Sequence, residues 1–320
     1  MPYELTAFGE ILIDFTHSNP GEDGPALFAQ NPGGAPGNVC VAINRLGGKS
    51  AFLGKVGEDM HGDLLRRTLE KENVSTKGLL NDPDSFTTLA FVSVDENGER
   101  SFSFARKPGA DTRMAAEEID LDEIRDGKIF HVGSLSLTHE PARSATIHAL
   151  KSAQDFGKMI SYDPNYRASL WNSEEEAIEA MRSLIPYAQI MKISDEETAL
   201  LTGKADPKEA AQELIRQGVQ IAAVTLGADG ALIANKEGSR IVPGFRSEVA
   251  DTNGAGDSFW GTMLYQIGVS GKKPEELTLD ELAEMTRFAN AAAALTCTKH
   301  GAIPALPTKK EVEDFLAAQK

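Results

Sequence analysis

The chain has 320 residues, of which 41% are hydrophobic and 25% charged, and its formal net charge is −16 at pH 7. This is a globular composition, and the length suits one large α/β domain or one such domain with a small appendage. Lys and Arg are spread along the chain, which argues against a nucleic-acid partner, and no apolar run reaches the roughly 18 residues of a membrane helix.

The N-terminal residues and the cysteines indicate the cellular compartment of the protein. The first residues lack the cationic and apolar regions of a secretory signal, which predicts a cytoplasmic protein. Cys40 and Cys297 lie far apart, each in an apolar helical pattern. Two such thiols predict buried, reduced side chains rather than a disulfide or a metal site.

Two early segments predict strands outside the core of the fold. The segment near residues 15–30 is a candidate for extended structure. Residues 85–106 predict a hairpin, with strands at 86–94 and 101–104 around an Asn-Gly turn, whose residues adopt positive φ angles. Several strands outside a parallel core usually form a sheet of their own, so the two segments predict a small β-sheet lid.

From residue 128 onward, apolar runs of strand length alternate with helical periods. Such alternation implies βαβ units, in which helices cover both faces of a parallel sheet. We therefore predict an α/β fold with a doubly wound, mostly parallel sheet, in one domain spanning residues 1–320. The expected strands are residues 128–133, 158–162, 189–193 and 221–226, and the expected helices are residues 141–156, 174–184, 195–201 and 209–216.

The most informative stretch is DTNGAGDSFWG, residues 251–261, which continues as an apolar helical period. The small residues Gly254, Ala255 and Gly256 allow a tight turn that aims backbone N–H groups at an anion, at the start of a helix. Asp257 would then lie in the first helical turn, able to take a proton from an attacking hydroxyl. Together these features indicate phosphoryl transfer, although a bare GAGD equally fits an ordinary Gly-rich loop before a helix.

Longer strings resemble a known family. DTNGAGD at residues 251–257 resembles the C-terminal signature of the ribokinase-like, phosphofructokinase-B-type carbohydrate kinases, and GGAPGN at residues 33–38 resembles their N-terminal signature. The two strings have the family's order and a suitable separation. The resemblance covers nearly the whole chain, through GKVGEDMHG at 54–62, DPNYR at 163–167, TLGADG at 225–230 and the segment 299–304.

The resemblance implies an ATP-dependent sugar kinase that forms no covalent enzyme intermediate. Asp257 would be the catalytic base, and the backbone at Gly254, Ala255 and Gly256 would form an anion hole for the transferred phosphoryl group. The positions that match the nucleotide site are Lys192, Ser194, Thr225, Gly227, Gly230 and Asn290.

The resemblance also implies Mg²⁺ and K⁺. Glu197 matches the glutamate that helps to place Mg²⁺ near the phosphates, usually through water. Many family members have Asn where this chain has Ser194. A helix N-cap is therefore as good an interpretation of Ser194 as a contact to phosphate or metal. The K⁺ site, held largely by backbone carbonyls behind the anion hole, matches Asp251, Asn253, Thr296, Lys299, Gly301 and Ala305.

On the sugar side, Asp14 follows a strand-like run at residues 7–13 and matches the aspartate that accepts hydrogen bonds from sugar hydroxyls. Arg106 and Arg167 are expected to hold several hydroxyls or a carboxylate, because a guanidinium donates in a fork. The other matching positions are Gly33, Gly34, Asn38, Phe104 and Asn165.

The strings SFSF at residues 101–104 and RKPGAD at 106–111 resemble the bacterial and plant fructokinases, so the resemblance favours transfer to the primary hydroxyl of fructose, giving fructose 6-phosphate. Kinases of 2-keto-3-deoxygluconate are the alternative, since they also use paired arginines, although they often have tyrosine where this chain has Phe104. A non-catalytic sugar or nucleotide sensor is the alternative from another class. Relatives often dimerise through their lids, so a homodimer is also expected.

Overall fold

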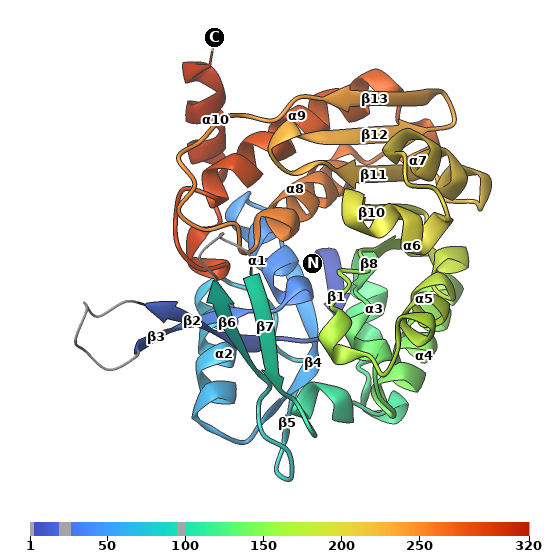
Figure 1. Ribbon diagram of the computed structural model, residues 1–320. Helices are drawn as coiled ribbons and strands as arrows, with labels where there is room; N and C mark the ends of the chain where they lie inside the picture. Colours follow the sequence, from blue (N-terminus) through green and yellow to red (C-terminus); the bar gives the residue numbers. More distant parts are fainter. Residues whose placement is uncertain (1–2, 19–26, 95–99, 320) are drawn as a thin grey trace.

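A computed structural model describes residues 3–18, 27–94 and 100–319. Its main feature is a nine-stranded sheet with the order β13-β12-β11-β10-β9-β8-β1-β4-β5 (Figure 1). Neighbours are parallel from β11 to β5, and β12 and β13 add an antiparallel edge. The strands are β1 (Tyr3–Phe8), β4 (Ser50–Gly57), β5 (Leu79–Asp82), β8 (Gly127–Val132), β9 (Met159–Tyr162), β10 (Ile190–Ser194), β11 (Ile221–Thr225), β12 (Ala231–Asn235) and β13 (Gly238–Val242).

Helices cover both faces of this sheet. In β11, Ile221 and Ala223 pack into the hydrophobic cluster formed with α1, α2, α8 and α9, whereas Ala222 and Val224 pack into the cluster formed with α3 to α7. Because successive strand residues point to opposite faces, a strand buried on both faces is apolar throughout. The helices are α1 (Ala35–Arg45), α2 (Met60–Lys71), α3 (Leu121–Asp126), α4 (Ala142–Asp155), α5 (Glu174–Arg182), α6 (Thr198–Thr202), α7 (Pro207–Arg216), α8 (Ala255–Ser270), α9 (Leu279–Thr296) and α10 (Lys309–Ala318).

The predicted doubly wound, mostly parallel sheet is confirmed, and local signals set its element boundaries. The helix α7 begins with Pro207 at its first position, and the carboxylate of the preceding Asp206 accepts a hydrogen bond from the N–H of Glu209. Proline and a side-chain cap both suit a helix start, where backbone N–H groups lack helical partners. The expected elements from residue 128 onward agree with the structure to within three residues, but the edge strands β12 and β13 were not expected.

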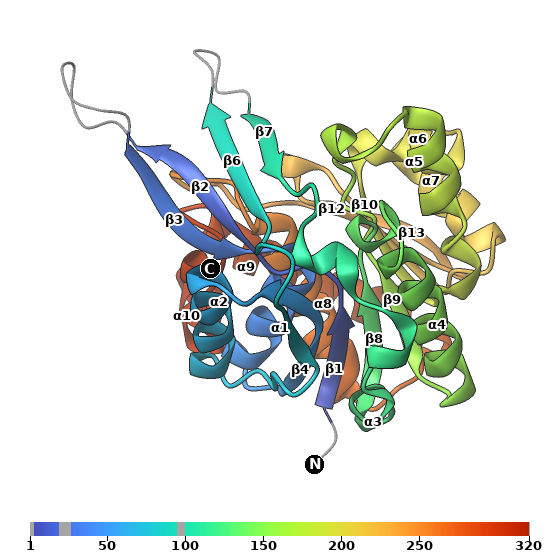
Figure 2. The same ribbon diagram turned by 90° about the horizontal axis from the view of Figure 1, so that it is seen from below.

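A second, four-stranded sheet has the order β3-β2-β6-β7 and stands beside the large sheet (Figure 2). Its strands are β2 (Leu12–Ser18), β3 (Leu27–Gly33), β6 (Leu89–Val94) and β7 (Arg100–Ala105). The predicted small sheet is thus confirmed. The expected turn at residues 96–99 lies outside the described residues, as does the middle of the segment near 15–30.

Two predicted strands differ from the structure. The strand expected at 86–94 begins only at Leu89, because Thr87 bonds instead to the carboxylate of Asp59, which caps α2. The apolar run at 7–13 is divided between two sheets, since β1 ends at Phe8 and β2 begins at Leu12. Both halves are buried, so hydrophobicity alone gave no sign of the break. Asp14 therefore lies within β2 rather than after a strand.

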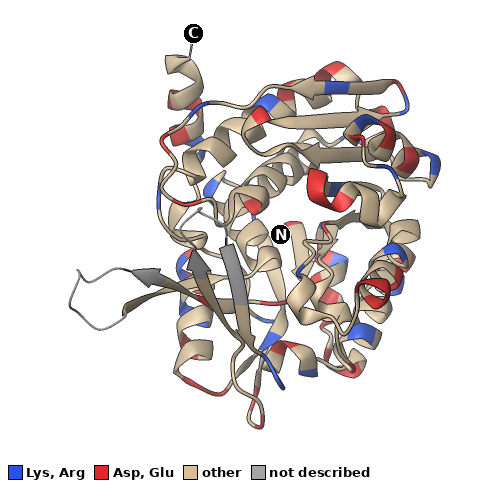
Figure 3. Cartoon of the chain, in the orientation of Figure 1, with Lys and Arg blue, Asp and Glu red and all other residues tan. Residues whose placement is uncertain are grey.

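The surface charges, the two cysteines and the helix lengths can be compared with the predictions from composition. Acidic and basic side chains are interspersed over the elements (Figure 3). Cys40 is buried, as predicted, but Cys297 follows α9 and is only half-buried. None of the helices in the described part of the chain is both long and apolar enough to cross a membrane.

Candidate active site

The start of α8 forms an anion-binding turn. Gly254 adopts a left-handed conformation with φ 77°, and a Cβ added there would lie 3.0 Å from the Cα of Ala302. Both the backbone angle and the close approach require glycine. The first N–H groups of a helix lack carbonyl partners within it and favour a negative charge. The N–H of Ala255 also donates a long hydrogen bond to the Thr252 carbonyl, at 3.3 Å, but the helix start as a whole can bind a phosphoryl group through the backbone.

Asp257 lies in the first turn of this helix and is half-buried. The side-chain Nδ2 of Asn38, on α1, donates a hydrogen bond to Asp257 Oδ2 over 2.7 Å. Burial raises the pKa of the Asp257 carboxyl to about 6, against the lowering effect of the Asn38 hydrogen bond. The carboxylate form predominates at neutral pH, so Asp257 can act as a general base.

A buried ion pair lies beneath the anion-binding turn. Lys192 Nζ, on β10, is 2.9 Å from Asp163 Oδ2, and a Cβ added to Gly256 would lie 3.3 Å from the same nitrogen. Burial favours neutral lysine, but the carboxylates of Asp163 and Glu197 outweigh this effect and hold the pKa of Lys192 above its ordinary value. A positive charge therefore faces the position where a phosphoryl group would bind.

A narrow cavity, the sugar-side cavity, opens on the Asp257 side of the turn. Of the residues predicted to bind sugar, Asp14, Gly34, Asn38, Phe104, Asn165 and Arg167 line it. Gly33 lies at the end of β3 against the Asp14 carboxylate and is not part of the lining. Glu10, Leu12, Ala35, Leu135, Asn253 and Asp257 complete the lining.

Asp14 joins the small sheet to this cavity. It is buried within β2, and its Oδ2 accepts a hydrogen bond from Asn253 Nδ2 over 3.3 Å. Burial raises the pKa of the Asp14 carboxyl to about 6, and the Asn253 hydrogen bond opposes that rise. The side chain is mainly ionised at neutral pH and can accept hydrogen bonds from hydroxyl groups.

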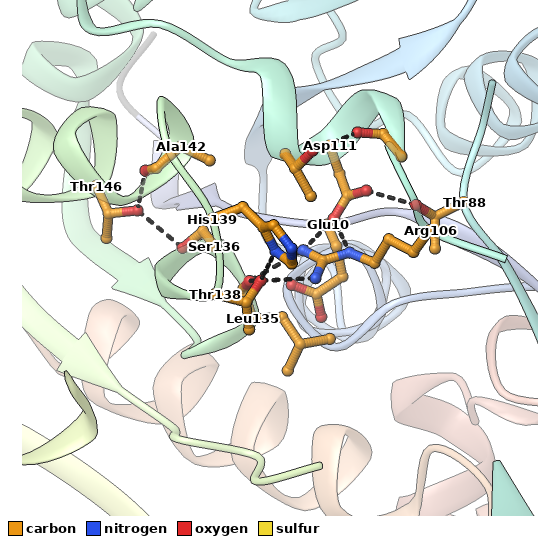
Figure 4. A network of polar contacts seen from close by, with 12 residues as sticks. Glu10, Thr88, Arg106, Asp111, Leu135, Ser136, Thr138, His139, Ala142 and Thr146 are labelled. Atoms are coloured by element: carbon orange, nitrogen blue, oxygen red, sulfur yellow. Dashed lines mark hydrogen bonds and ion pairs between the residues drawn. The ribbon is translucent and has the colours of Figure 1, made fainter. Parts of the chain in front are cut away.

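The two arginines that sequence reasoning treated alike occupy different environments. Arg167 lines the cavity, whereas Arg106 does not, because its guanidinium is paired with Asp111 at 2.6 Å and both side chains are only 2% exposed. The remaining Arg106 donors bond to Thr138 Oγ1 at 2.7 Å and the Leu135 carbonyl at 2.9 Å (Figure 4). The direct sugar contact expected for Arg106 is not supported. Arg106 instead anchors the end of β7 to the core.

A larger cavity of about 470 Å³, the nucleotide-side cavity, lies on the other side of the turn. Its polar and small lining residues include the predicted Thr225, Gly227, Gly230, Ala255, Gly256 and Asn290. Sequence reasoning missed Phe245, Val249 and Cys297, which add an apolar wall from segments that carry no motif. Gly256 lines this cavity and the adjacent Asp257 lines the other, so the two cavities meet at the first turn of α8.

Lys192 and Ser194, also predicted to contact nucleotide, do not line the larger cavity. Ser194 is an N-cap, the alternative that its sequence context left open. Its backbone N–H and its hydroxyl both donate to Glu197 Oε2, at 2.7 and 3.0 Å, while Glu197 Oε1 accepts from the N–H of Tyr166 at 2.7 Å. Glu197 thereby holds together the segments that carry Tyr166 and Ser194.

The positions matched to K⁺ lie on two segments that contact each other. Asp251 Oδ1 and Oδ2 accept hydrogen bonds from the N–H groups of Asn253 and Gly301, at 2.9 and 3.0 Å. Thr296 donates to the carbonyl of Ala292, Lys299 pairs with Glu311 at 3.1 Å, and Ala305 is buried. Within residues 3–18, 27–94 and 100–319, no group of three or more His, Cys, Asp or Glu side chains could hold a metal ion.

Sequence reasoning missed two carboxylates. Asp163 is the partner of Lys192, and Glu10 lines the sugar-side cavity at the junction of β1 and β2. A possible signal for Glu10 was its position as a charged residue inside an otherwise apolar run. Such a residue is rarely buried without a specific role.

A helix start suited to an anion lies between the two cavities with the Asp257 carboxylate beside it, an arrangement that suits phosphoryl transfer between two small molecules. The model of the pfkB family carbohydrate kinases matches residues 3–309. The "Probable fructokinase-2" of Arabidopsis thaliana is 44% identical over 321 residues, covering 98% of this chain and 96% of the relative.

Solved structures agree with this match. Fructokinase from Xylella fastidiosa with bound ATP superposes with a TM-score of 0.91 at 34% identity, covering 99% of each chain. Fructokinase from Vibrio cholerae, in a fructose-, ADP- and calcium-bound form, gives a TM-score of 0.88 at 35% identity and 98% coverage of each chain. A double mutant of that protein is described with fructose, ADP and potassium. The chain belongs to the pfkB family of carbohydrate kinases.

Proposed function

We propose that the protein transfers the γ-phosphoryl group of ATP to the primary hydroxyl of fructose, forming fructose 6-phosphate and ADP. The observation that carries this proposal is the position of Asp257, which lines the sugar-side cavity next to Gly256 in the nucleotide-side cavity. Relatives that contain ATP, or fructose with ADP, support the choice of substrates. A non-catalytic sensor would not need this base beside an intact anion-binding turn.

The reaction follows from this placement. The fructose hydroxyl gives its proton to Asp257 as its oxygen bonds to the γ-phosphorus, and the bond to the β-phosphate oxygen breaks to release ADP. Backbone N–H groups at Gly254, Ala255 and Gly256 stabilise the charge that develops on the transferred group. Lys192 adds a fixed positive charge beneath it.

The cation predictions belong to this proposal. When bound, Mg²⁺ would neutralise phosphate charge, and Glu197 fits a contact through water because both its oxygens already accept protein hydrogen bonds. For K⁺, Asp251 fits as an organising residue, since it holds the segments of Asn253 and Gly301 together. The expected ligands there are backbone carbonyls.

The sugar-side cavity favours a neutral sugar over an acidic one. Arg167 is its single basic lining residue in the described chain, and three carboxyl groups, those of Glu10, Asp14 and Asp257, face the same space. A second arginine for an acid's carboxylate is lacking, because Arg106 is already paired with Asp111. This observation ranks 2-keto-3-deoxygluconate below fructose.

The small sheet is proposed to act as a lid. The sugar-side cavity holds only about 40 Å³, against about 470 Å³ for the nucleotide-side cavity, and Phe104 of β7 is part of its wall. Closure of the sheet over a bound hexose would exclude water from the site of phosphoryl transfer.

The outer part of the lid also supports the expected homodimer. Leu27, Phe28 and Phe91 of the small sheet are 48%, 45% and 37% exposed. The rings of Phe28 and Phe91 lie 5.9 Å apart, so apolar surface is gathered at one place that a second copy could cover.

Location in the cytoplasm remains a prediction, and one relative is chloroplastic by its name.

A sugar panel tests the proposed function. ADP formation is measured with ATP and fructose, glucose, ribose or 2-keto-3-deoxygluconate, and the product is located by phosphorus NMR. We expect turnover with fructose and phosphate on its C6 oxygen. Turnover confined to another sugar would contradict the substrate, and the absence of turnover with every sugar would contradict the kinase.

A further inference from the structure

Glu10 is a buried carboxyl group whose second oxygen lacks a hydrogen-bond partner in the part of the chain that the structure describes. It is 2% exposed, lies between β1 and β2, and lines the sugar-side cavity. Its Oε1 accepts a hydrogen bond from the N–H of Ala35 over 3.2 Å, but its Oε2 has no hydrogen-bond partner among the described residues. A buried polar atom without a partner is costly. This oxygen therefore has the environment of a ligand contact.

The neighbouring cation does not supply the missing contact. Arg106 is near enough to interact electrostatically with Glu10, but its nitrogens donate to Asp111, Thr138 and Leu135 (Figure 4). Asp111 is itself satisfied by Arg106 and by the hydroxyl of Thr88. The charged and titratable groups near Glu10 or across its cavity are Arg106, Asp111, His139, Asp14, Arg167 and Asp257.

These surroundings determine the protonation of Glu10. Burial raises the pKa of its carboxyl to about 8, and the nearby Asp111 charge adds to that effect while Arg106 opposes it. The group is thus mainly a neutral acid at pH 7, with an O–H that can donate. The carboxylates of Asp14 and Asp257 can only accept hydrogen bonds in their ionised form. A sugar in this cavity needs donors for its own oxygen lone pairs as well.

We propose that Glu10 is a further sugar-binding residue that donates a hydrogen bond from Oε2 to a sugar oxygen. The inference deepens the proposed function and rests on it. Glu10 would complement Asp14, because one group donates to the sugar while the other accepts from it. The arrangement also gives sugar affinity a dependence on pH that neither the nucleotide-side cavity nor the anion-binding turn would produce.

Titration of fructose binding tests this proposal. The dissociation constant for fructose is measured by calorimetry between pH 6.5 and 9.5, with a non-hydrolysable ATP analogue present so that no turnover occurs. Since ionisation removes the donor, we expect the wild-type constant to rise about tenfold between pH 7 and pH 9.

Three variants separate sugar binding from a structural role. In Glu10→Gln the amide donates at every pH and its oxygen can still accept from Ala35, so we expect tight binding with little dependence on pH. Glu10→Ala should weaken fructose binding at least about fivefold at pH 7 while leaving binding of the nucleotide analogue unchanged. The control is Glu123→Gln, a glutamate with a buried, unpartnered Oε2 that does not line the cavity. It should behave as wild type.

The outcomes are distinct. Wild-type affinity that is level or rises with pH, or an equal pH dependence in Glu10→Gln and wild type, would overturn the role of Glu10. Wild-type protein that binds no fructose would instead contradict the proposed function. The same titration, made with the sugar that the enzyme does phosphorylate, would then decide whether Glu10 is a donor.

Discussion

The two cavities that meet at Asp257 are built from different kinds of group. The nucleotide-side cavity uses glycines, small residues and an apolar wall, and its phosphate end is a helix start. The sugar-side cavity uses carboxyl, amide and guanidinium side chains from the β1–β2 junction, β2, α1, the loop after β9, and α8 with the loop before it. Backbone binding suits a phosphate common to many kinases, whereas a set of side chains can be varied to select one sugar. We therefore expect substrate specificity to be set on the sugar side.

Replacing Asp257 tests the point where the two cavities join, and its effect should be the largest. Asp257→Asn keeps the size of the side chain and an oxygen that accepts from Asn38, but the amide cannot take the hydroxyl proton. We expect kcat to fall by about 10²–10⁴. Thermal unfolding and binding of ATP should stay near wild type. Near-normal turnover in steady-state assays would show that Asp257 is not the base.

Replacing Arg106 should lower stability, whereas replacing Arg167 should weaken fructose binding. Arg106→Met leaves Asp111 as a buried unpaired charge, so we expect a loss of about 3–5 kcal/mol in the free energy of unfolding. Arg167→Met removes hydroxyl contacts worth about 0.5–1.5 kcal/mol, which would raise KM for fructose by about 2- to 13-fold with little loss of stability.

Denaturant unfolding and steady-state kinetics measure both arginine variants. Arg106→Met/Asp111→Leu serves as the control, because removing both charges should restore part of the lost stability. Equal destabilisation by the two single variants would contradict the difference in environment. An unchanged KM for fructose in Arg167→Met would remove Arg167 from the sugar side.

The pH profile of kcat/KM should report Asp257, because this ratio follows ionisation of the free enzyme. Its pKa is raised to about 6, and below that pH the protonated form, which cannot accept a proton, predominates. We therefore expect kcat/KM to be at least about tenfold lower at pH 5 than at pH 8. Because the Asn38 hydrogen bond lowers the pKa, Asn38→Ala should move this acidic limb to higher pH. A level profile down to pH 5, with the protein still folded, would oppose the assignment.

The sequence predicted the anion-binding turn and part of each cavity beside it, and its errors have a physical reason. Phosphate binding needs a particular backbone path, so it leaves contiguous glycines such as those at 254–256. The sugar side depends on side chains brought together by long-range packing. Local pattern could not show that Arg106 turns toward Asp111, or that the run at residues 7–13 divides between two sheets and places Glu10 in the cavity.

Direct competition between fructose and 2-keto-3-deoxygluconate tests most directly the claim that the sugar side selects a neutral ketohexose. Both offer a primary hydroxyl to Asp257, so the anion-binding turn cannot discriminate between them. With Arg167 the single basic lining residue in the described chain, we predict a kcat/KM for fructose at least about tenfold higher, or about 1.4 kcal/mol in transition-state binding. A preference of the same size for the acid would contradict this account.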